Sequence, residues 1–184
     1  MPKLIHIFTS LTLTLMIASL PLHSTASENR QLPEFTQNDS ANWINSAPLS
    51  RNSLLGKVVL LDIWTFECWN CYRSFPWLIG LEKKFPDDDF IIVGVHSPEF
   101  EREKNRRRVS DKVKEFGRTH PVMIDNDFSY WRALGNRYWP QYYLVDREGR
   151  IRDVFAGETH DGDARAIRIE SGIRALLAEK ADSD

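Results

Sequence analysis

The chain has few cysteines and no block of charge of one sign. Its 184 residues include two cysteines, Cys68 and Cys71, and carry a formal net charge of only −2. Neither cysteine lies near the N-terminus, which argues against a lipid anchor on a cysteine there. The chain also lacks a one-sided basic region of the kind that binds nucleic acid, and it contains no repeat. The charge pattern therefore suggests no nucleic-acid partner.

Metal ligands are equally sparse. A structural zinc site needs four ligands, usually Cys and His side chains. One cysteine pair is present, but the three histidines beyond residue 26 are scattered, at His96, His120 and His160. We therefore expect neither a metal nor a small-molecule cofactor.

The N-terminal segment has the composition of an export signal. Residues 1–26 contain a single cation, Lys3, no acidic residue, a mostly apolar stretch from 4 to 22, and small residues up to Ala26. This pattern predicts a signal peptide cleaved before Ser27. The alternative is an uncleaved N-terminal membrane anchor, because the apolar stretch approaches the ~20 residues that span a bilayer. Either interpretation places the rest of the chain outside the cytoplasm.

Two apolar runs predict central strands of a sheet. Residues 58–64 and 90–95 are nearly continuous apolar runs of strand length, as is typical of strands buried on both faces. Between them a helix is predicted over residues 72–85, with Pro86 as its stop. The expected elements after them are a helix near 109–116, a strand at 122–124, a helix at 129–134, strands at 142–145 and 151–155, and an amphipathic helix from 163. This order predicts an α/β fold with a central mixed β-sheet flanked by helices.

The two cysteines stand between the first apolar strand and the helix that follows it. Two residues, Trp69 and Asn70, separate them. At a helix start, side chains at i and i+3 share a face about 5–6 Å apart, so a disulfide can close without backbone movement. The amides and dipole of a helix N-terminus favour an anion, so the pKa of the first thiol should fall below its usual value. Cys68 is thus the expected attacking sulfur, and Cys71 the resolving one.

The alternative interpretation of this pair is a purely structural disulfide. Exported proteins often carry such bonds. However, a loop this short restricts few conformations of the unfolded chain and would add little stability. A redox-active disulfide is therefore the preferred interpretation.

The surroundings of the cysteines resemble the thioredoxin superfamily. Asp62 lies six residues before Cys68, Trp64 lies four before it, and Pro76 lies five after Cys71. More closely, the segments 64–68, 95–100 and 136–140 resemble the exported TlpA-like and DipZ-type redoxin branch. The resemblance implies a thioredoxin-like domain over residues 54–184, and residues 27–53 are expected to be a linker leading into irregular or edge-strand structure.

The resemblance also implies roles for residues around the pair. Asp62 would be a buried carboxylate that exchanges a proton with Cys71 during catalysis. The Trp139–Pro140 bond would be cis and lie against the cysteines, where it would present backbone to an extended substrate. Trp69 is expected to be exposed and to contact substrate. We expect His96 and Glu99 to lie in a solvated loop, and the charged run 101–108 to be a solvated helix face.

These features together predict an extracytoplasmic thiol–disulfide oxidoreductase that acts on protein disulfides and exchanges electrons with a membrane partner. The acidic Glu67 beside Cys68 opposes thiolate formation, which favours a reductase. One alternative is a thiol peroxidase, because Thr65 stands three residues before Cys68 as in peroxiredoxins. Another is a copper carrier that adds a histidine to the two thiols.

Overall fold

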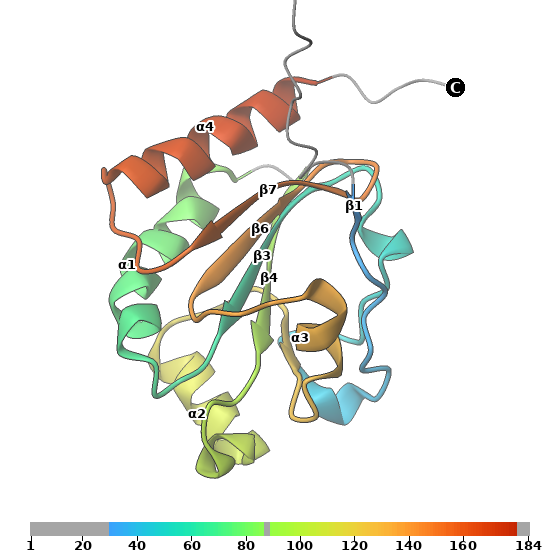
Figure 1. The fold of residues 1–184 in the computed structure, drawn as a ribbon, viewed down its shortest axis with the longest axis vertical. Coiled ribbons are helices and arrows are strands. Elements are labelled where there is room, and N and C mark those ends of the chain that lie inside the picture. The colour runs from blue at the N-terminus through green and yellow to red at the C-terminus, as the bar shows by residue number, and fades with distance from the viewer. Residues whose placement is uncertain (1–29, 87–88, 180–184) are drawn as a thin grey trace, which may run out of the picture.

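A computed structural model of the chain describes residues 30–86 and 89–179 (Figure 1). The predicted signal segment, residues 1–26, lies outside these ranges. No helix within them is long and apolar enough to cross a membrane.

A seven-stranded mixed sheet forms the centre of the structure. In spatial order its strands run β1-β7-β6-β3-β4-β5-β2. β3, β4 and β5 are parallel, whereas the remaining neighbours pair antiparallel. The strands span β1 Arg30–Gln31, β2 Trp43–Ile44, β3 Val58–Trp64, β4 Phe90–His96, β5 Val122–Ile124, β6 Gln141–Val145 and β7 Arg150–Ala156.

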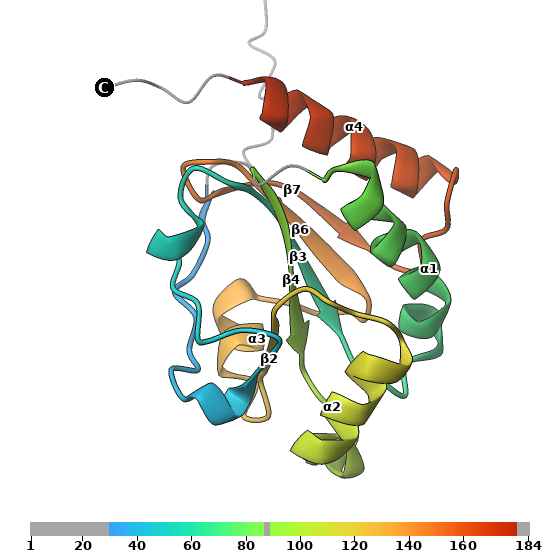
Figure 2. The same ribbon diagram turned by 180° about the vertical axis from the view of Figure 1, so that it is seen from behind.

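Helices cover both faces of this sheet. The α-helices span α1 Trp69–Lys84, α2 Arg106–Glu115, α3 Ser129–Leu134 and α4 Ala164–Ala178, and short 3-10 helices span η1 Ser40–Asn42, η2 Asn52–Leu54 and η3 Glu101–Lys104. α1 and α4 lie on one face with α2 beside them, and α3 lies on the other face with the N-terminal segment (Figures 1 and 2). The predicted α/β architecture with a flanked mixed sheet is confirmed.

The central position of β3 follows from its sequence. All seven of its residues are buried, and it pairs with β4 on one side and β6 on the other. Alternate side chains therefore enter the apolar clusters on opposite faces of the sheet. The parallel register sets Asp62 opposite Gly94 and Trp64 opposite His96, so the C-terminal ends of two buried strands meet beside the cysteine turn.

α1 begins three residues earlier than predicted because Cys68 itself caps it. The Cys68 sulfur accepts a hydrogen bond from the backbone N–H of Cys71 at 3.1 Å. Cysteine is not among the residue types that usually announce a helix start, so sequence patterns place the start too late. The helix ends at Lys84, two residues before Pro86.

The segment before β3 takes part in the fold. Its described residues, from Arg30 onward, include β1 and β2, which form the two opposite edges of the sheet. Leu32, Phe35 and Trp43 are buried in the apolar cluster on the α3 face. Both strands precede residue 54, where the predicted domain begins.

Candidate active site

Cys68 and Cys71 form a disulfide at the N-terminus of α1. Their Cα atoms are 5.2 Å apart, which agrees with the spacing expected for i and i+3 positions. Cys71 is fully buried, whereas Cys68 keeps 9% of its surface exposed. The outer sulfur can therefore meet a partner first, while the inner one lies one helical turn deeper.

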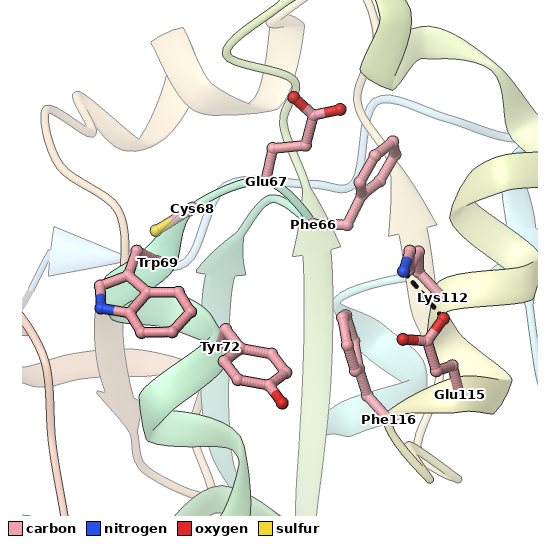
Figure 3. Close-up of a pocket in the computed structure, with 8 residues that line it drawn as sticks. All are labelled: Phe66, Glu67, Cys68, Trp69, Tyr72, Lys112, Glu115 and Phe116. Carbon is pink, nitrogen blue, oxygen red and sulfur yellow. Dashed lines mark hydrogen bonds and ion pairs between the residues drawn. The ribbon is translucent and has the colours of Figure 1, made fainter.

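A pocket of about 320 Å³ opens beside Cys68 (Figure 3). Trp69 is 66% exposed, as expected, and its ring stacks on Tyr72 with centroids 5.5 Å apart. On the α2 side, Phe116 packs edge-on against Tyr72, and Lys112 pairs with Glu115 at the rim. The entrance to the sulfur is thus flanked by flat aromatic surface.

The loop before β6 also packs against the cluster that contains the cysteines. The Trp139–Pro140 peptide bond is cis, as the resemblance implied. Trp139 packs against the apolar cluster that contains both cysteines, and its indole N–H donates to the Ser97 carbonyl at 2.9 Å. The ring is further supported by Trp131, 4.3 Å away between centroids. Trp139 is therefore fixed in place and half-buried.

Asp62 is a buried carboxylate, but it is paired with a cation. Arg118, also fully buried, donates to Asp62 Oδ2 at 2.5 Å. The guanidinium lies over the rings of Trp64 and Phe75, which pack in the cluster that contains the cysteines. The absence of a side chain at Gly94 gives it room, because a Cβ there would lie only 3.1 Å from Arg118 Nη2.

A hydrogen-bonded chain continues from Arg118 toward the surface. Arg118 Nε donates to His120 Nε2 at 3.2 Å, so the imidazole carries its proton on Nδ1 and donates it to Glu82 at 2.9 Å. Burial, and then the positive charge of Arg118, lower the pKa of His120. The hydrogen bond from His120 lowers the pKa of Glu82. The ring is thus neutral and acts as a fixed acceptor for the guanidinium.

A second buried polar cluster lies under the loop that precedes Cys68. The Thr65 hydroxyl donates to Glu103 Oε1 at 2.5 Å, and His96 Nε2 lies 3.2 Å from the same hydroxyl oxygen. Because Thr65 gives its hydrogen to Glu103, the His96 Nε2–H donates to Thr65. Burial, and then the charge of Arg118, lower the pKa of His96 to about 3.

This cluster corrects two sequence expectations. His96 is fully buried rather than part of a solvated loop, because it is the last residue of β4 and stacks on Phe66. Within the charged run 101–108, Glu103 is fully buried and turns inward. A charge in a polar run usually points to solvent, and only the fold brings donors to this one.

Glu67 is half-buried next to Cys68 and is held by two arginines. Arg102 forms a short ion pair with it, and Arg108 Nη2 lies 3.4 Å from its other oxygen. The hydrogen bond from Arg102 lowers the pKa of Glu67. The sequence argument took only the negative charge of Glu67 into account, and in the structure the charges of Arg102 and Arg108 offset it.

The geometry gives little support to the two alternative functions. The hydroxyl of Thr65, the residue on which the peroxidase interpretation rests, is engaged by Glu103 and His96. Over residues 30–86 and 89–179, no group of three or more Cys, His, Asp or Glu side chains is arranged to hold a metal ion. The copper-carrier interpretation lacks its third ligand there.

Sequence patterns missed Arg118, His120 and Glu103. Arg118 and His120 follow the turn at Gly117 and precede Pro121, in a stretch with no motif. The one usable signal was Gly94, a glycine inside a buried strand and opposite Asp62, which marks a close approach by another group.

The chain is similar to several known proteins. It is 41% identical over 148 residues to SUPPRESSOR OF QUENCHING 1 of Arabidopsis thaliana, covering 80% of this chain and 14% of that protein. It is 37% identical to Protein DipZ of Mycobacterium bovis, covering 73% and 19% of the two chains. The chain thus spans less than a fifth of these relatives. It is also 29% identical to the thiol-disulfide oxidoreductase YkuV of Bacillus subtilis, covering 80% and 95%.

Solved structures and a family profile agree with the observed fold. A thioredoxin-like protein solved in the oxidised form matches with a TM-score of 0.70 and 26% identity, covering 80% of this chain and 97% of that one. The fold is therefore thioredoxin-like. The profile of the Redoxin family matches residues 27–168, which include the cysteine pair, the Asp62–Arg118 pair and the cis-proline loop. The chain belongs to the Redoxin family.

Proposed function

We propose that this protein is a thiol–disulfide oxidoreductase that acts on protein disulfides. The observation that carries the proposal is the Cys68–Cys71 disulfide at the start of α1, in which Cys68 keeps 9% of its surface exposed and Cys71 is fully buried. A short, locally closed bond of this kind suits a cycle of opening and closing better than a structural role. The similarity to YkuV, over nearly all of that protein, supports the same reaction.

The reaction proceeds in two exchange steps. In the reduced protein, the Cys68 thiolate attacks one sulfur of a partner disulfide, which forms a mixed disulfide and releases the other partner sulfur as a thiolate that takes up a proton. Cys71 then loses its proton and attacks Cys68, which restores the Cys68–Cys71 bond and frees the second partner thiol. Two electrons pass from the dithiol to the partner.

Asp62 is proposed to accept the proton that Cys71 gives up. Its support is the burial of Asp62 in β3 and its pairing with Arg118, whose guanidinium stacks on Trp64 and Phe75 in the cluster that contains Cys71. A carboxylate held in a dry site is a suitable general base for a thiol. Arg118 provides the positive charge that keeps this carboxylate in the apolar interior.

Trp69, Trp139 and Pro140 are proposed to contact the partner. Trp69 offers exposed aromatic surface beside the sulfur, and Trp139 is held against the cysteine cluster. Pro140 has no N–H, so the backbone before it presents carbonyl acceptors without a competing donor at that position. An extended partner segment can pair with such backbone while its own disulfide meets Cys68.

The proposed direction is reduction of the partner. Near Cys68 the carboxylates of Glu67 and Glu103 are matched by the guanidinium groups of Arg102 and Arg108. A strong oxidant needs a strongly stabilised thiolate. Balanced charge leaves mainly the helix N-terminus to stabilise it, which favours a couple of the thioredoxin kind.

The proposal also includes an extracytoplasmic site of action and a membrane partner that re-reduces the disulfide. Both rest on the export-type composition of residues 1–26. Expression of the full chain with a C-terminal tag, followed by cell fractionation and N-terminal sequencing, tests the location. We expect an exported chain that begins at Ser27, or an exported chain held in the membrane. A full-length cytoplasmic chain would contradict it.

Trapping of the mixed disulfide tests the reaction itself. Reduced Cys71→Ser protein, mixed with a disulfide-containing protein such as insulin, should accumulate a covalent complex that dithiothreitol releases. Reduced wild-type protein should instead turn the substrate over, and Cys68→Ser should do neither. Full activity in Cys68→Ser would remove the proposal.

A further inference from the structure

Glu103 presents both oxygens of its fully buried carboxylate to hydrogen-bond donors. Oε2 accepts from the backbone N–H groups of Glu99 and Phe100 at 2.7 and 2.8 Å. Oε1 accepts from the Thr65 hydroxyl at 2.5 Å and from the backbone N–H of Glu67 at 2.9 Å. Four donors on one carboxylate explain how the charge is kept in the interior, because hydrogen bonds to the charged form offset its desolvation.

Local helix capping accounts for only half of this arrangement. A glutamate at the third position of a helix commonly reaches back to the N–H at the helix start, as Glu103 Oε2 does at the beginning of η3. Oε1 instead bonds to residues 36 and 38 positions earlier in the chain. The side chain therefore ties two distant segments together, and one of them is the loop from Thr65 to Glu67 that leads into Cys68.

The same loop is held from its other side. The Glu67 backbone bonds to Glu103 inside the protein, while the Glu67 side chain pairs with Arg102 and Arg108 outside it. Cys68 follows immediately, and its sulfur must lie over the first turn of α1 to accept the Cys71 N–H. A loop fixed at Thr65 and Glu67 leaves the next residue little freedom to leave that position.

Protons in the cluster are fixed as well. The chain of donors runs from His96 Nε2–H to the Thr65 hydroxyl and from there to Glu103. The neighbouring charged and titratable groups are Arg118, whose field reaches His96, and the Glu67–Arg102–Arg108 group at the surface. Arg102 of this surface group also acts electrostatically on Glu103. The four hydrogen bonds hold the Glu103 carboxylate in place.

We propose that Glu103 is a positioning residue for the nucleophile: it anchors the loop from Thr65 to Glu67 so that Cys68 stands at the N-terminus of α1. This inference rests on the proposed function, since it assigns Cys68 the attacking role. Glu103 acts through the loop and touches no reacting atom.

The test uses a substitution that keeps the carboxylate of residue 103 but shortens its side chain. Glu103→Asp retains a carboxylate but is one methylene shorter, so it cannot meet both segments at once. Glu101→Asp is the matched control, because Glu101 lies in the same short helix, has a side chain 85% exposed and forms a surface ion pair with Lys104. The measurement is the pH dependence of Cys68 alkylation by iodoacetamide in the reduced, folded proteins, with thermal unfolding recorded alongside.

We expect the alkylation midpoint of Glu103→Asp to rise by roughly half a unit to one unit, because Cys68 loses part of the helix N-terminus. Glu101→Asp should match the wild type. A folded Glu103→Asp protein with a lower melting temperature and an unchanged or lower midpoint would overturn the proposal, since a merely stabilising residue has that signature.

If Glu103→Asp does not fold, Thr65→Val replaces it. This variant keeps the carboxylate and its backbone donors and removes one anchor from the loop. A smaller rise of the midpoint is expected, and no rise would overturn the proposal. Alkylation needs no protein substrate, so a wild-type protein that alkylates normally but fails to reduce insulin would count against the proposed function and not against the role of Glu103.

Discussion

Asp62 and Glu103 are both fully buried carboxylates, but their surroundings differ. Asp62, in β3, is held by the guanidinium of Arg118. Glu103, in η3, is held by three backbone N–H groups and one hydroxyl. A cation can neutralise a buried charge without fixing the backbone around it, whereas backbone donors fix the loops that carry them. The first arrangement pairs the Asp62 charge with a cation, and the second fixes the loops around Glu103.

In each site a neutral histidine forms a hydrogen bond with a residue that contacts the carboxylate. His120 accepts from Arg118, and His96 donates to Thr65. Burial lowers the pKa of both rings, so neither adds a charge to the interior near neutral pH. The two sites thus share a neutral histidine but differ in the groups that contact the carboxylate directly. Mutations can therefore change one site without changing the other.

The largest effect is expected from removing the cation. Arg118→Met leaves the Asp62 carboxylate buried without its partner, and breaking a buried pair in this way costs about 3–5 kcal/mol of unfolding free energy. Chemical denaturation monitored by tryptophan fluorescence measures the loss.

The double variant Asp62→Asn/Arg118→Met is the control for that measurement. It should recover a large part of the lost stability, because no unpaired charge remains. A single Arg118→Met variant as stable as the wild type would show that the pair does not hold Asp62 in the way described.

The pH dependence of stability should be the next largest effect. The pKa of His96 is lowered from 6.5 to about 3 in the folded protein, so between these values the unfolded chain binds the proton. Stability from this group is therefore present above pH 6.5 and is lost as the pH falls, by about 2 kcal/mol between pH 7 and pH 5. His120 contributes with the same sign, since its pKa is also lowered.

Comparison of the wild type with His96→Gln isolates the His96 contribution. The variant should lose less stability than the wild type over that interval, and the difference should approach the stated amount. Equal losses in the two proteins would mean that His96 is not kept neutral by the fold.

An effect comparable to that of pH, and smaller than that of Arg118→Met, is expected at the other carboxylate. Thr65→Val removes one of the four donors to Glu103 and leaves the rest, so the loss should be about 1.5–3 kcal/mol, the value typical of a hydrogen bond to a charged group. Denaturation under the same conditions as for Arg118→Met gives the comparison directly. A loss larger than that of Arg118→Met would reverse the proposed contrast between the two sites.

The smallest effect concerns the ion pairs that Glu67 forms with Arg102 and Arg108 beside Cys68. Arg102→Gln with Arg108→Gln leaves Glu67 unpaired at the surface, and the Cys68 alkylation midpoint should rise by less than about half a unit at low salt. The shift should disappear near 1 M salt, where exposed charges are screened. A shift that persists in high salt would show a structural rather than an electrostatic effect.

The strands and the cysteine helix were predictable because their information is local. The apolar runs at 58–64 and 90–95 have the length and the β-branched content of strands buried on both faces, and the cysteine spacing predicts a helix start. The anchoring of the active-site loop was not predictable in this way. Glu103 and Thr65 are 38 residues apart, and a glutamate within a charged run resembles a solvated one until the fold brings buried donors to it.

The pairing of Arg118 with Asp62 was likewise not predictable from local sequence patterns. The resemblance implied a buried Asp62, but nothing in the sequence named the group that compensates its charge. That group comes from the turn after α2 and passes over Gly94 on the neighbouring strand. Long-range pairing of this kind depends on strand order, which local patterns leave undetermined.

The reduction potential of the Cys68/Cys71 couple tests the central claim most directly. Equilibration in glutathione or dithiothreitol buffers, with the free thiols then quantified, should show one reversible two-electron transition that involves both cysteines. We expect a potential of about −270 mV or below, the region of thioredoxin. A transition near about −120 mV would make the protein an oxidant, and the absence of a reversible transition would contradict disulfide exchange at this pair.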